Sequence, residues 1–236
     1  MPIDASLQNE WKKAAAESAA QLVQDGMVVG LGTGSTAAFF VEALARRLSN
    51  ESLRVTGIPT SERTAAHARD LKIPLTTFAE HTRIDLTVDG ADEVELGTLS
   101  LIKGHGGALL REKIVAAASD RMVVVADETK VSEKLGTLAS LPVEIVPFGW
   151  QATLKRLGDL GGNPALRLGA DRAPLVTDGG NYIADCAFGP MTSPKETAHH
   201  LDHIIGAVEH GLFLGFAQEV IVGGSSGTKT LKRSNK

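Results

Sequence analysis

The stretch Met27-Val-Val-Gly-Leu-Gly-Thr-Gly-Ser-Thr36 decides the fold class of this chain. Its first half, residues 27–31, is a short apolar run of the kind that forms a buried strand. A glycine-rich turn follows, and apolar residues then recur at helical spacing at Ala37, Phe40, Val41, Leu44 and Leu48. A strand, a glycine turn and a helix in this order predict the start of an α/β sheet.

The segments on either side of this stretch continue the α/β pattern. An amphipathic helix around Trp11 precedes it and is expected to end at Asp25-Gly26. Apolar runs at residues 54–58, 84–89 and 122–126 predict further strands, with helices between them. This alternation builds a parallel sheet with right-handed crossovers, so we predict a Rossmann-like main domain.

The pattern changes from about Leu135. Residues 141–147 predict a strand bounded by prolines, and Asp178-Gly-Gly-Asn181 predicts a hairpin turn between strands at residues 175–177 and 182–184. Ser193-Pro194-Lys195-Glu196 has capping-box spacing and predicts a helix with a buried face formed by Leu201, Ile204, Ile205 and Val208. These signals predict a smaller α+β domain.

We place this smaller domain at residues 134–206, inserted near the C-terminus of the chain. Residues 1–133 and 207–236 then form the α/β catalytic domain, because residues 219–222 predict a strand that returns to the first sheet. The polar end from Gly223 is expected to be frayed.

The composition is that of a chain that can bury a substantial core. Of its 236 residues, 43% are hydrophobic and 22% charged, which suits one large domain or two unequal ones. A formal net charge of -4 without a basic block, together with 4% aromatic residues, argues against nucleic-acid binding. Cys186 is the only cysteine, which excludes an intrachain disulfide. With neither a signal-peptide pattern nor a long apolar run, we expect a cytoplasmic location and no membrane span.

The glycine turn has the features of a phosphate site. Gly30, Gly32 and Gly34 permit close backbone approach, and the following helix offers unpaired N–H groups at the positive end of its dipole. Ser35 replaces the third glycine of a dinucleotide fingerprint, and no Gly-Lys-Ser/Thr ends the turn, so a monophosphate fits better than ATP or NAD. The alternative is a structural turn in which Ser35 or Thr36 is the N-cap.

Asp89-Gly-Ala-Asp92-Glu93 falls at the carboxyl end of a predicted strand, where open α/β sheets place their ligands. Acidic side chains there can exchange protons with sugar hydroxyls. No histidine lies nearby with ligand spacing, so we expect no metal. The alternative is a solvated acidic turn.

Lys103-Gly-His-Gly-Gly-Ala-Leu-Leu-Arg-Glu112 combines a glycine loop with a lysine and a glutamate at the start of a helix. We expect Leu109, Leu110, Ile114 and Ala117 to form the buried face of this helix, which would turn Glu112 towards a cleft. The alternative is that Glu112 only complements the helix dipole and that Lys103 is a solvated loop residue. Because the three motifs all stand at strand-to-helix junctions, we expect them on one edge of one sheet.

Four motifs follow one another along the chain: Gly32-Thr-Gly-Ser-Thr36, Asp89-Gly-Ala-Asp92-Glu93, Lys103-Gly-x-Gly-Gly-Ala-Leu-x-Arg-Glu112-Lys113 and Ala126-Asp127-x-x-Lys130. A Gly-Leu-Phe run from Gly211 precedes the last predicted strand. In this order the motifs resemble those of the ribose-5-phosphate isomerase family of the A type, over nearly the whole chain. His105 departs from the pattern, because the family usually has an uninterrupted glycine run there.

The resemblance implies an aldose-ketose isomerase that interconverts D-ribose 5-phosphate and D-ribulose 5-phosphate through an enediolate, in the non-oxidative branch of the pentose phosphate pathway. It implies a homo-oligomer, dimer or tetramer, that needs no metal or organic cofactor. By resemblance Glu112 is the catalytic base, and Lys103, Asp89 and Asp92 line the O1 and O2 side of the substrate. The implied substrate-binding residues are Thr33, Gly34, Ser35, Thr36, Asp89, Gly90, Ala91, Asp92, Lys103, Gly104, His105, Gly106 and Lys130, with Lys12 as a further candidate.

Two functions of other classes fit parts of the pattern. A non-catalytic sugar-phosphate sensor would keep the phosphate turn but would have no reason to keep Glu112 and Lys103 together. A CoA transferase could use a glutamate nucleophile, but the chain lacks the length for a two-part CoA site. We expect His105 to point to solvent, with donation to a substrate oxygen as the alternative, and His199-His200 to lie on the surface.

Overall fold

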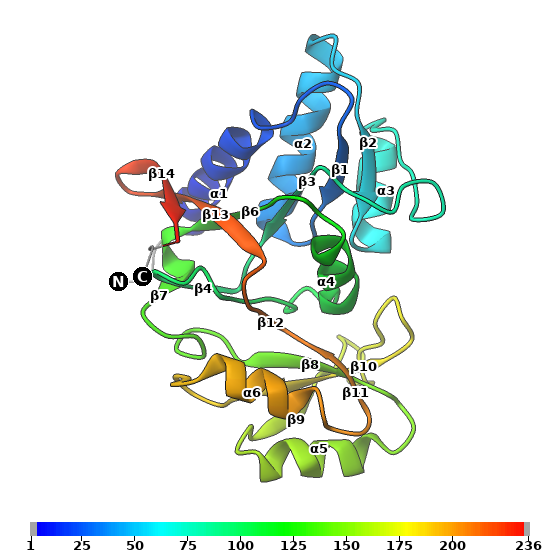
Figure 1. Ribbon diagram of the computed structural model, residues 1–236, viewed down its shortest axis with the longest axis vertical. Helices are drawn as coiled ribbons and strands as arrows, with labels where there is room; N and C mark the ends of the chain where they lie inside the picture. Colours follow the sequence, from blue (N-terminus) through cyan, green and yellow to red (C-terminus); the bar gives the residue numbers. More distant parts are fainter. Residues whose placement is uncertain (1–3, 234–236) are drawn as a thin grey trace.

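The computed structural model describes residues 4–233, and its central element is a six-stranded sheet (Figure 1). The strand order across this sheet is β14-β13-β6-β3-β1-β2. Its strands are β1 (Val28–Leu31), β2 (Thr56–Pro59), β3 (Leu86–Gly90), β6 (Met122–Asp127), β13 (Ala217–Gly224) and β14 (Gly227–Lys232). Strands β2, β1, β3, β6 and β13 run parallel to one another and only the edge strand β14 is antiparallel, which confirms the predicted α/β class with a largely parallel sheet.

Helices cover this sheet and supply most of its core. They are α1 (Ala5–Ala20), α2 (Ser35–Asn50), α3 (Glu62–Asp70) and α4 (Leu109–Ala117). The main apolar cluster joins the alanine face of α1 and the predicted face of α2, including Phe40 and Leu44, to Val29, Leu31 and Val88 of the sheet. The helical spacing read from the sequence of α2 is therefore the spacing that packs the core.

A second sheet of four strands lies apart from the first, at the lower end of the molecule in Figure 1. Its order is β11-β8-β10-β9, and its strands are β8 (Leu141–Ile145), β9 (Pro164–Leu166), β10 (Tyr182–Cys186) and β11 (Ala207–His210). Helices α5 (Trp150–Asp159) and α6 (Pro194–Leu201) pack on it around a separate apolar cluster that includes Leu157 and Leu201. The sequence pattern that changes near Leu135 thus corresponds to a separate sheet. We keep the division into two domains as a proposal.

A third sheet of four short strands joins the two regions in the order β12-β5-β4-β7. These strands are β4 (Glu93–Glu95), β5 (Leu101–Ile102), β7 (Val131–Ser132) and β12 (Leu212–Phe213), and the 3-10 helix η1 (Glu128–Lys130) precedes β7. Of the chain between residues 4 and 233, no helix is both long and apolar enough to cross a bilayer.

Two local predictions in the C-terminal half are wrong. Residues 175–177 form no strand, although Thr177 and Asn181 close the predicted turn, and β10 pairs with β8 and β9 instead. The helix that starts at Pro194 ends at Leu201, and Gly206, with a φ of +97°, directly precedes β11. Ile204, Ile205 and Val208 are therefore not on that helix, and β11 extends the second sheet to residue 210.

The predicted fraying after Gly223 is also wrong. Gly227–Lys232 form β14, which pairs antiparallel with β13 through a tight turn at Ser225-Ser226. Residues 234–236, which the prediction also covered, lie outside the described residues. Gly227 has a φ of +95°, which the turn requires and glycine allows. Backbone hydrogen bonds to β13 hold this edge strand. Because its side chains are mostly polar, the sequence shows no alternating apolar pattern that would have predicted a strand here.

Candidate active site

The glycine turn and the acidic strand end meet because β1 and β3 are neighbours in the sheet. Gly32 follows β1, and Asp89 is the penultimate residue of the adjacent strand β3. A Cβ at Gly32 would lie 2.3 Å from Asp89 Oδ1, so this close approach admits only glycine. The backbone N–H groups of Thr33 and Gly90 donate to Asp89 Oδ1 at 3.0 and 2.7 Å. The turn therefore fixes the Asp89 carboxylate.

A buried lysine joins two carboxylates at this place. Lys103 Nζ lies 3.0 Å from Asp89 Oδ2 and 3.2 Å from Glu112 Oε1, and it donates to Gly90 O at 2.7 Å. All three charged side chains are buried. The three residues come from β3, from the loop after β5 and from α4, and the structure brings them together as the sequence motifs predicted.

Burial and charge shift the pKa values of all three groups in this cluster upward. Burial raises the pKa of Glu112 to about 8, opposed by the Lys103 ammonium and reinforced by Asp89. Burial alone would lower the pKa of Lys103, but Asp89 and Glu112 outweigh it and the net shift is upward. Burial also raises the pKa of Asp89, against the opposing effect of Lys103 and of two backbone N–H groups. Lys103 therefore stays charged.

Of the two buried carboxyl groups, we assign the exchangeable proton to Glu112 rather than to Asp89. Asp89 Oδ1 accepts two backbone hydrogen bonds, which stabilise its charged form. Asp89 Oδ2 and Glu112 Oε2 are both buried without a hydrogen-bond partner within residues 4–233, but Asp89 Oδ2 lies 3.0 Å from Lys103 Nζ, and of the two residues only Glu112 lines the cleft. A buried oxygen without a partner is available to a reacting proton.

The cleft over this cluster also contains the amino-terminal end of α2. Gly34 is the N-cap, with a φ of +114°, and no side chain caps the helix. Ser35, Thr36, Lys12 and Lys130 line the cleft together with Lys103 and Glu112, and Lys12 Nζ lies 3.4 Å from Ser35 Oγ. Uncapped N–H groups, two hydroxyls and two ammonium groups in one cleft are the features that favour an anion.

Thr33 lies in the same turn, but its hydroxyl makes hydrogen bonds to other buried side chains of the fold. Its Oγ1 lies 2.7 Å from Thr60 Oγ1, 2.8 Å from Ser61 Oγ and 3.1 Å from Thr64 Oγ1, and all four side chains are buried. The sequence analysis missed Thr60, Ser61 and Thr64. Their only signal is the serine N-cap of α3, whose hydroxyl accepts from Thr64 N.

Asp92 and the glycine loop form the wall on the other side. Gly90, Ala91, Asp92, Gly104 and Gly106 all line the cleft, whereas His105 does not. Asp92 accepts a hydrogen bond from His105 N at 2.9 Å, and the exposed imidazole lies with Nε2 3.0 Å from Ser140 O. Gly104 and Gly107 have positive φ but His105 does not, so the loop accepts a side chain at position 105 without strain.

The buried face predicted for α4 is wrong. Leu109, Glu112, Val115 and Ala116 are buried, while Ile114 is 47% exposed and Ala117 is exposed. Glu112 therefore lies on the buried face of the helix. The prediction treated glutamate as a polar residue that avoids the core, and only the partner Lys103 makes its burial tolerable.

Glu93, the last carboxylate of the acidic motif, has a structural role. Its two oxygens accept four backbone hydrogen bonds, from Gly136, Thr137, Leu138 and Ala139. The side chain is fully buried and anchors residues 136–139. Sequence spacing alone does not separate this carboxylate from Asp89 and Asp92.

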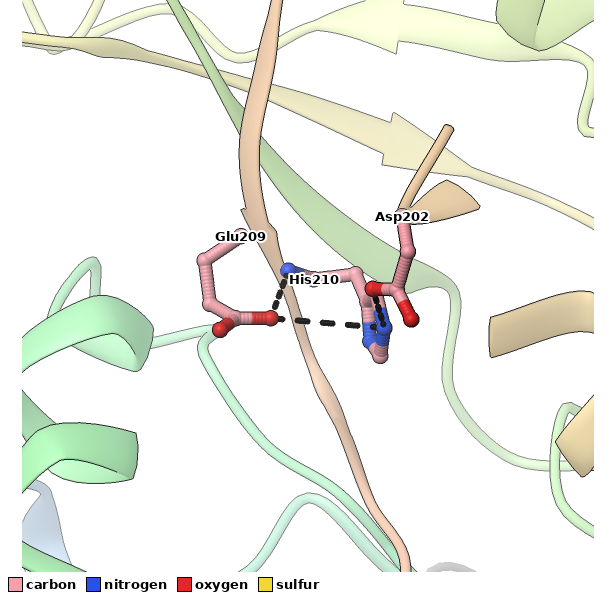
Figure 2. Close-up of side chains that lie close together, drawn as sticks. All are labelled: Asp202, Glu209 and His210. Atoms are coloured by element: carbon pink, nitrogen blue, oxygen red, sulfur yellow. Dashed lines mark hydrogen bonds and ion pairs between the residues drawn. The ribbon is translucent and has the colours of Figure 1, made fainter. Parts of the chain in front are cut away.

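One cluster outside the cleft has the donor atoms of a metal site. Figure 2 shows Asp202, Glu209 and His210, whose ligand atoms lie within 4.8 Å of one another. Lys113 Nζ, however, lies 2.7 Å from Glu209 Oε1 and 3.4 Å from His210 Nδ1. The lysine ammonium thus supplies the positive charge that a cation would bring.

Fold and site together define an α/β enzyme that can move a proton on a small anionic molecule. A family model described as ribose 5-phosphate isomerase A (phosphoriboisomerase A) matches residues 56–227. Ribose-5-phosphate isomerase A of Synechococcus sp. (strain JA-3-3Ab) is 54% identical, over 96% of this chain and 98% of that protein. The chain therefore belongs to the ribose 5-phosphate isomerase A family.

Two solved structures support this assignment. Ribose 5-phosphate isomerase A from Methanocaldococcus jannaschii matches with a TM-score of 0.92 and 43% identity, over 96% of this chain and all of that one. A D-ribose-5-phosphate isomerase in complex with phospho-erythronic acid matches with a TM-score of 0.92 and 38% identity, over 95% of this chain and 98% of that one. Fold and family, both predicted from the sequence motifs, are confirmed.

Proposed function

We propose that this protein interconverts D-ribose 5-phosphate and D-ribulose 5-phosphate by proton transfer through an enediolate. The observation that carries the proposal is the buried Lys103–Glu112 pair, separated by 3.2 Å, in one cleft with the anion site at the start of α2. A sugar phosphate needs both features, one for its reacting carbons and one for its remote phosphate.

Glu112 acts as the base. As a carboxylate it removes the proton from C2 of the open-chain aldose, the C1–C2 bond gains double-bond character, and O1 takes the negative charge. The hydroxyl proton of O2 moves to O1, and Glu112 returns its proton to C1 to give the ketose. A pKa of about 8 suits both steps near neutral pH, since the carboxylate is formed readily and still holds a proton well.

Lys103 stabilises the enediolate. Its ammonium is buried and held by Asp89 and Gly90 O, so it needs no reorganisation when charge develops on O1 and O2. The ligand of the similar structure described above has a carboxylate in addition to its phosphate. A carboxylate spreads negative charge over two oxygens as an enediolate does, which supports placing this intermediate beside Lys103.

The structure favours different tasks for the two aspartates. Asp89 is fully buried and its oxygens are committed to Lys103 and two backbone N–H groups, so we assign it to holding Lys103. Asp92 lines the cleft and is partly exposed, so we assign it to ring opening. In Asp92→Asn, ribose 5-phosphate turnover should fall about 100-fold, while exchange of the C1 protons of ribulose 5-phosphate in D₂O stays near wild type. Equal losses in both assays would reject this division.

The main test is isomerisation of ribose 5-phosphate by the purified protein with chelator present, comparing wild type with Glu112→Gln. We expect the variant to lose about 10³-fold in kcat, because the amide cannot accept the C2 proton. The matched control is Glu133→Gln, which changes an exposed glutamate. Equal rates in wild type and Glu112→Gln would reject the base assignment. Tight binding of ribose 5-phosphate without turnover in wild type would favour a non-catalytic sensor.

We further propose that the protein is a cytoplasmic homo-oligomer in which the region around residues 134–206 takes part in subunit contact. Phe148 is 94% exposed and Ile205 is 77% exposed, and both lie close to the backbone hydrogen bond from Val146 N to Gly206 O. Exposed large apolar side chains of this kind favour an interface. Phe148→Asp should shift the protein to a smaller species in sedimentation analysis, and an unchanged mass would reject this contact.

A further inference from the structure

Residues 209–213 run from the end of β11 in the second sheet, through Gly211, to β12 in the third. This segment holds the backbone of Lys103. Lys103 N donates to Gly211 O at 2.9 Å, and β12 pairs with β5 directly before Lys103. A Cβ at Gly211 would lie 2.2 Å from Lys103 O, so only glycine allows this approach. The Gly-Leu-Phe run noted in the sequence thus packs against the catalytic lysine.

The same segment holds the helix that carries Glu112. Lys113, the next residue on α4, donates to Glu209 Oε1 at 2.7 Å and to His210 O at 2.6 Å, and its side chain is largely buried. The ring of Phe213 is near both lysines, with its centroid 5.0 Å from Lys113 Nζ and 5.5 Å from Lys103 Nζ. Residues 209–213 therefore contact both catalytic elements.

Helix α4 needs such an external contact. It has nine residues and no side-chain N-cap, and helices of this length depend on tertiary packing. Its exposed face carries Ile114, and Arg111 bonds Glu62 near its start. The bonds of Lys113 tie the helix to β11 one residue away from Glu112, so they constrain the rotation of the helix about its axis.

We propose that Lys113 and Glu209 are positioning residues that hold Glu112 against Lys103 during proton transfer. This inference rests on the function proposed above. Lys113 acts through the helix and does not touch the substrate, because it is absent from the lining of the cleft.

Of the groups at this ion pair, His210 keeps its charge state over the working pH range, and burial lowers the pKa of Lys113 against the attraction of Glu209. His210 Nδ1 accepts from Leu212 N at 3.2 Å, and Nε2 faces Asp202 Oδ1 at 3.2 Å. Burial and the Lys113 ammonium lower the pKa of His210 to about 4, so the imidazole stays neutral above pH 5. A change in the pH profile therefore reports Glu112, which faces Lys103, Asp89 and Asp92.

The test compares Lys113→Met, Glu209→Gln and the double variant with wild type. Lys113→Met keeps the length of the side chain and removes its charge. We expect kcat to fall about 10- to 100-fold with KM within about twofold, since a displacement of about 1 Å is enough for such a loss. The acid limb of kcat/KM should move to higher pH, because a looser contact with Lys103 weakens the attraction that lowers the pKa of Glu112.

The double variant separates positioning from stability. It removes both charges, so its melting temperature should recover relative to the single variants, while kcat stays low. Lys155→Met, which breaks the exposed pair of Lys155 and Asp159 on α5, is the matched control and should match wild type. Wild-type kcat in Lys113→Met, or kcat that recovers together with melting temperature in the double variant, would overturn the proposal.

A substrate-free measurement distinguishes this inference from the proposed function. The pKa of Glu112 can be followed by NMR of carboxyl-labelled glutamate in wild type and Lys113→Met. A higher pKa in the variant supports positioning even if ribose 5-phosphate is not the substrate, and an unchanged pKa together with normal kcat rejects it. Absence of isomerisation by the wild type would reject only the proposed function.

Discussion

Two buried glutamates in this protein, Glu93 and Glu112, have the same side chain and nearly the same burial but different surroundings. Glu93 accepts four backbone hydrogen bonds from residues 136–139. Glu112 meets a single lysine, and one of its oxygens has no partner in the described part of the chain. A fully bonded carboxylate stabilises the fold, whereas an incompletely bonded one is available for chemistry.

The variant with the largest expected effect removes the positive charge of Lys103, which contacts both Glu112 and Asp89. Lys103→Met should lower kcat by about 10³-fold, because the enediolate loses its preorganised cation. The variant should also be less stable at pH 8 than at pH 5, because the carboxylates of Asp89 and Glu112 repel each other when both are charged. Steady-state kinetics and thermal unfolding measure the two effects, with the exposed Lys195→Met as control. A kcat within tenfold of wild type would contradict the assignment.

At Glu93 we expect a substitution to lower the stability of the fold and to leave kcat unchanged. Glu93→Gln replaces one accepting oxygen by an NH₂ group that faces backbone donors, which should cost about 2–4 kcal/mol of unfolding free energy. The value of kcat should stay near wild type in protein that remains folded. Denaturant unfolding and kinetics on the same preparation check both points. Lost activity at unchanged stability would place Glu93 in the chemistry instead.

A pH series sharpens the comparison through stability alone. The pKa of Glu112 is raised in the folded protein, to about 8, so its contribution to stability is full below the unfolded pKa and is lost as pH rises through 8. Glu112→Gln has no such loss. At pH 9 its free energy of unfolding should exceed that of wild type by about 2 kcal/mol, and its melting temperature should be higher accordingly. At pH 4.5 the two proteins should be equally stable. A pH-independent difference would show that the burial cost is not electrostatic.

The smallest expected effect lies at the start of α2, where the cleft favours an anion. Ser35→Ala should raise KM about tenfold with little change in kcat, because one hydrogen bond to a charged phosphate is lost in ground and transition states alike. Inhibition by inorganic phosphate should weaken in parallel. Ser49→Ala, which changes a hydroxyl near the opposite end of the same helix, is the control and should leave KM unchanged. A fall in kcat alone would move Ser35 from binding to chemistry.

The fold was predictable where side-chain patterns are local. The strand, glycine turn and helix at residues 27–48 carry their periodicity within one segment, and the structure reproduces it in β1 and α2. Predictions failed where the side-chain pattern does not carry the outcome. β14 forms through backbone pairing with β13, and Glu112 turns inward because it meets Lys103 from another element.

The sequence by itself determined the class of the protein, the order of its motifs and the residue types available for catalysis. These follow from short-range spacing and from residues that must stand in fixed order along the chain. Only the tertiary structure decided which carboxylates keep an unbonded oxygen, which of the acidic side chains line the cleft and that residues 209–213 support both catalytic elements. The physical reason is that burial and hydrogen bonding depend on groups from distant segments, which meet only after the chain has folded.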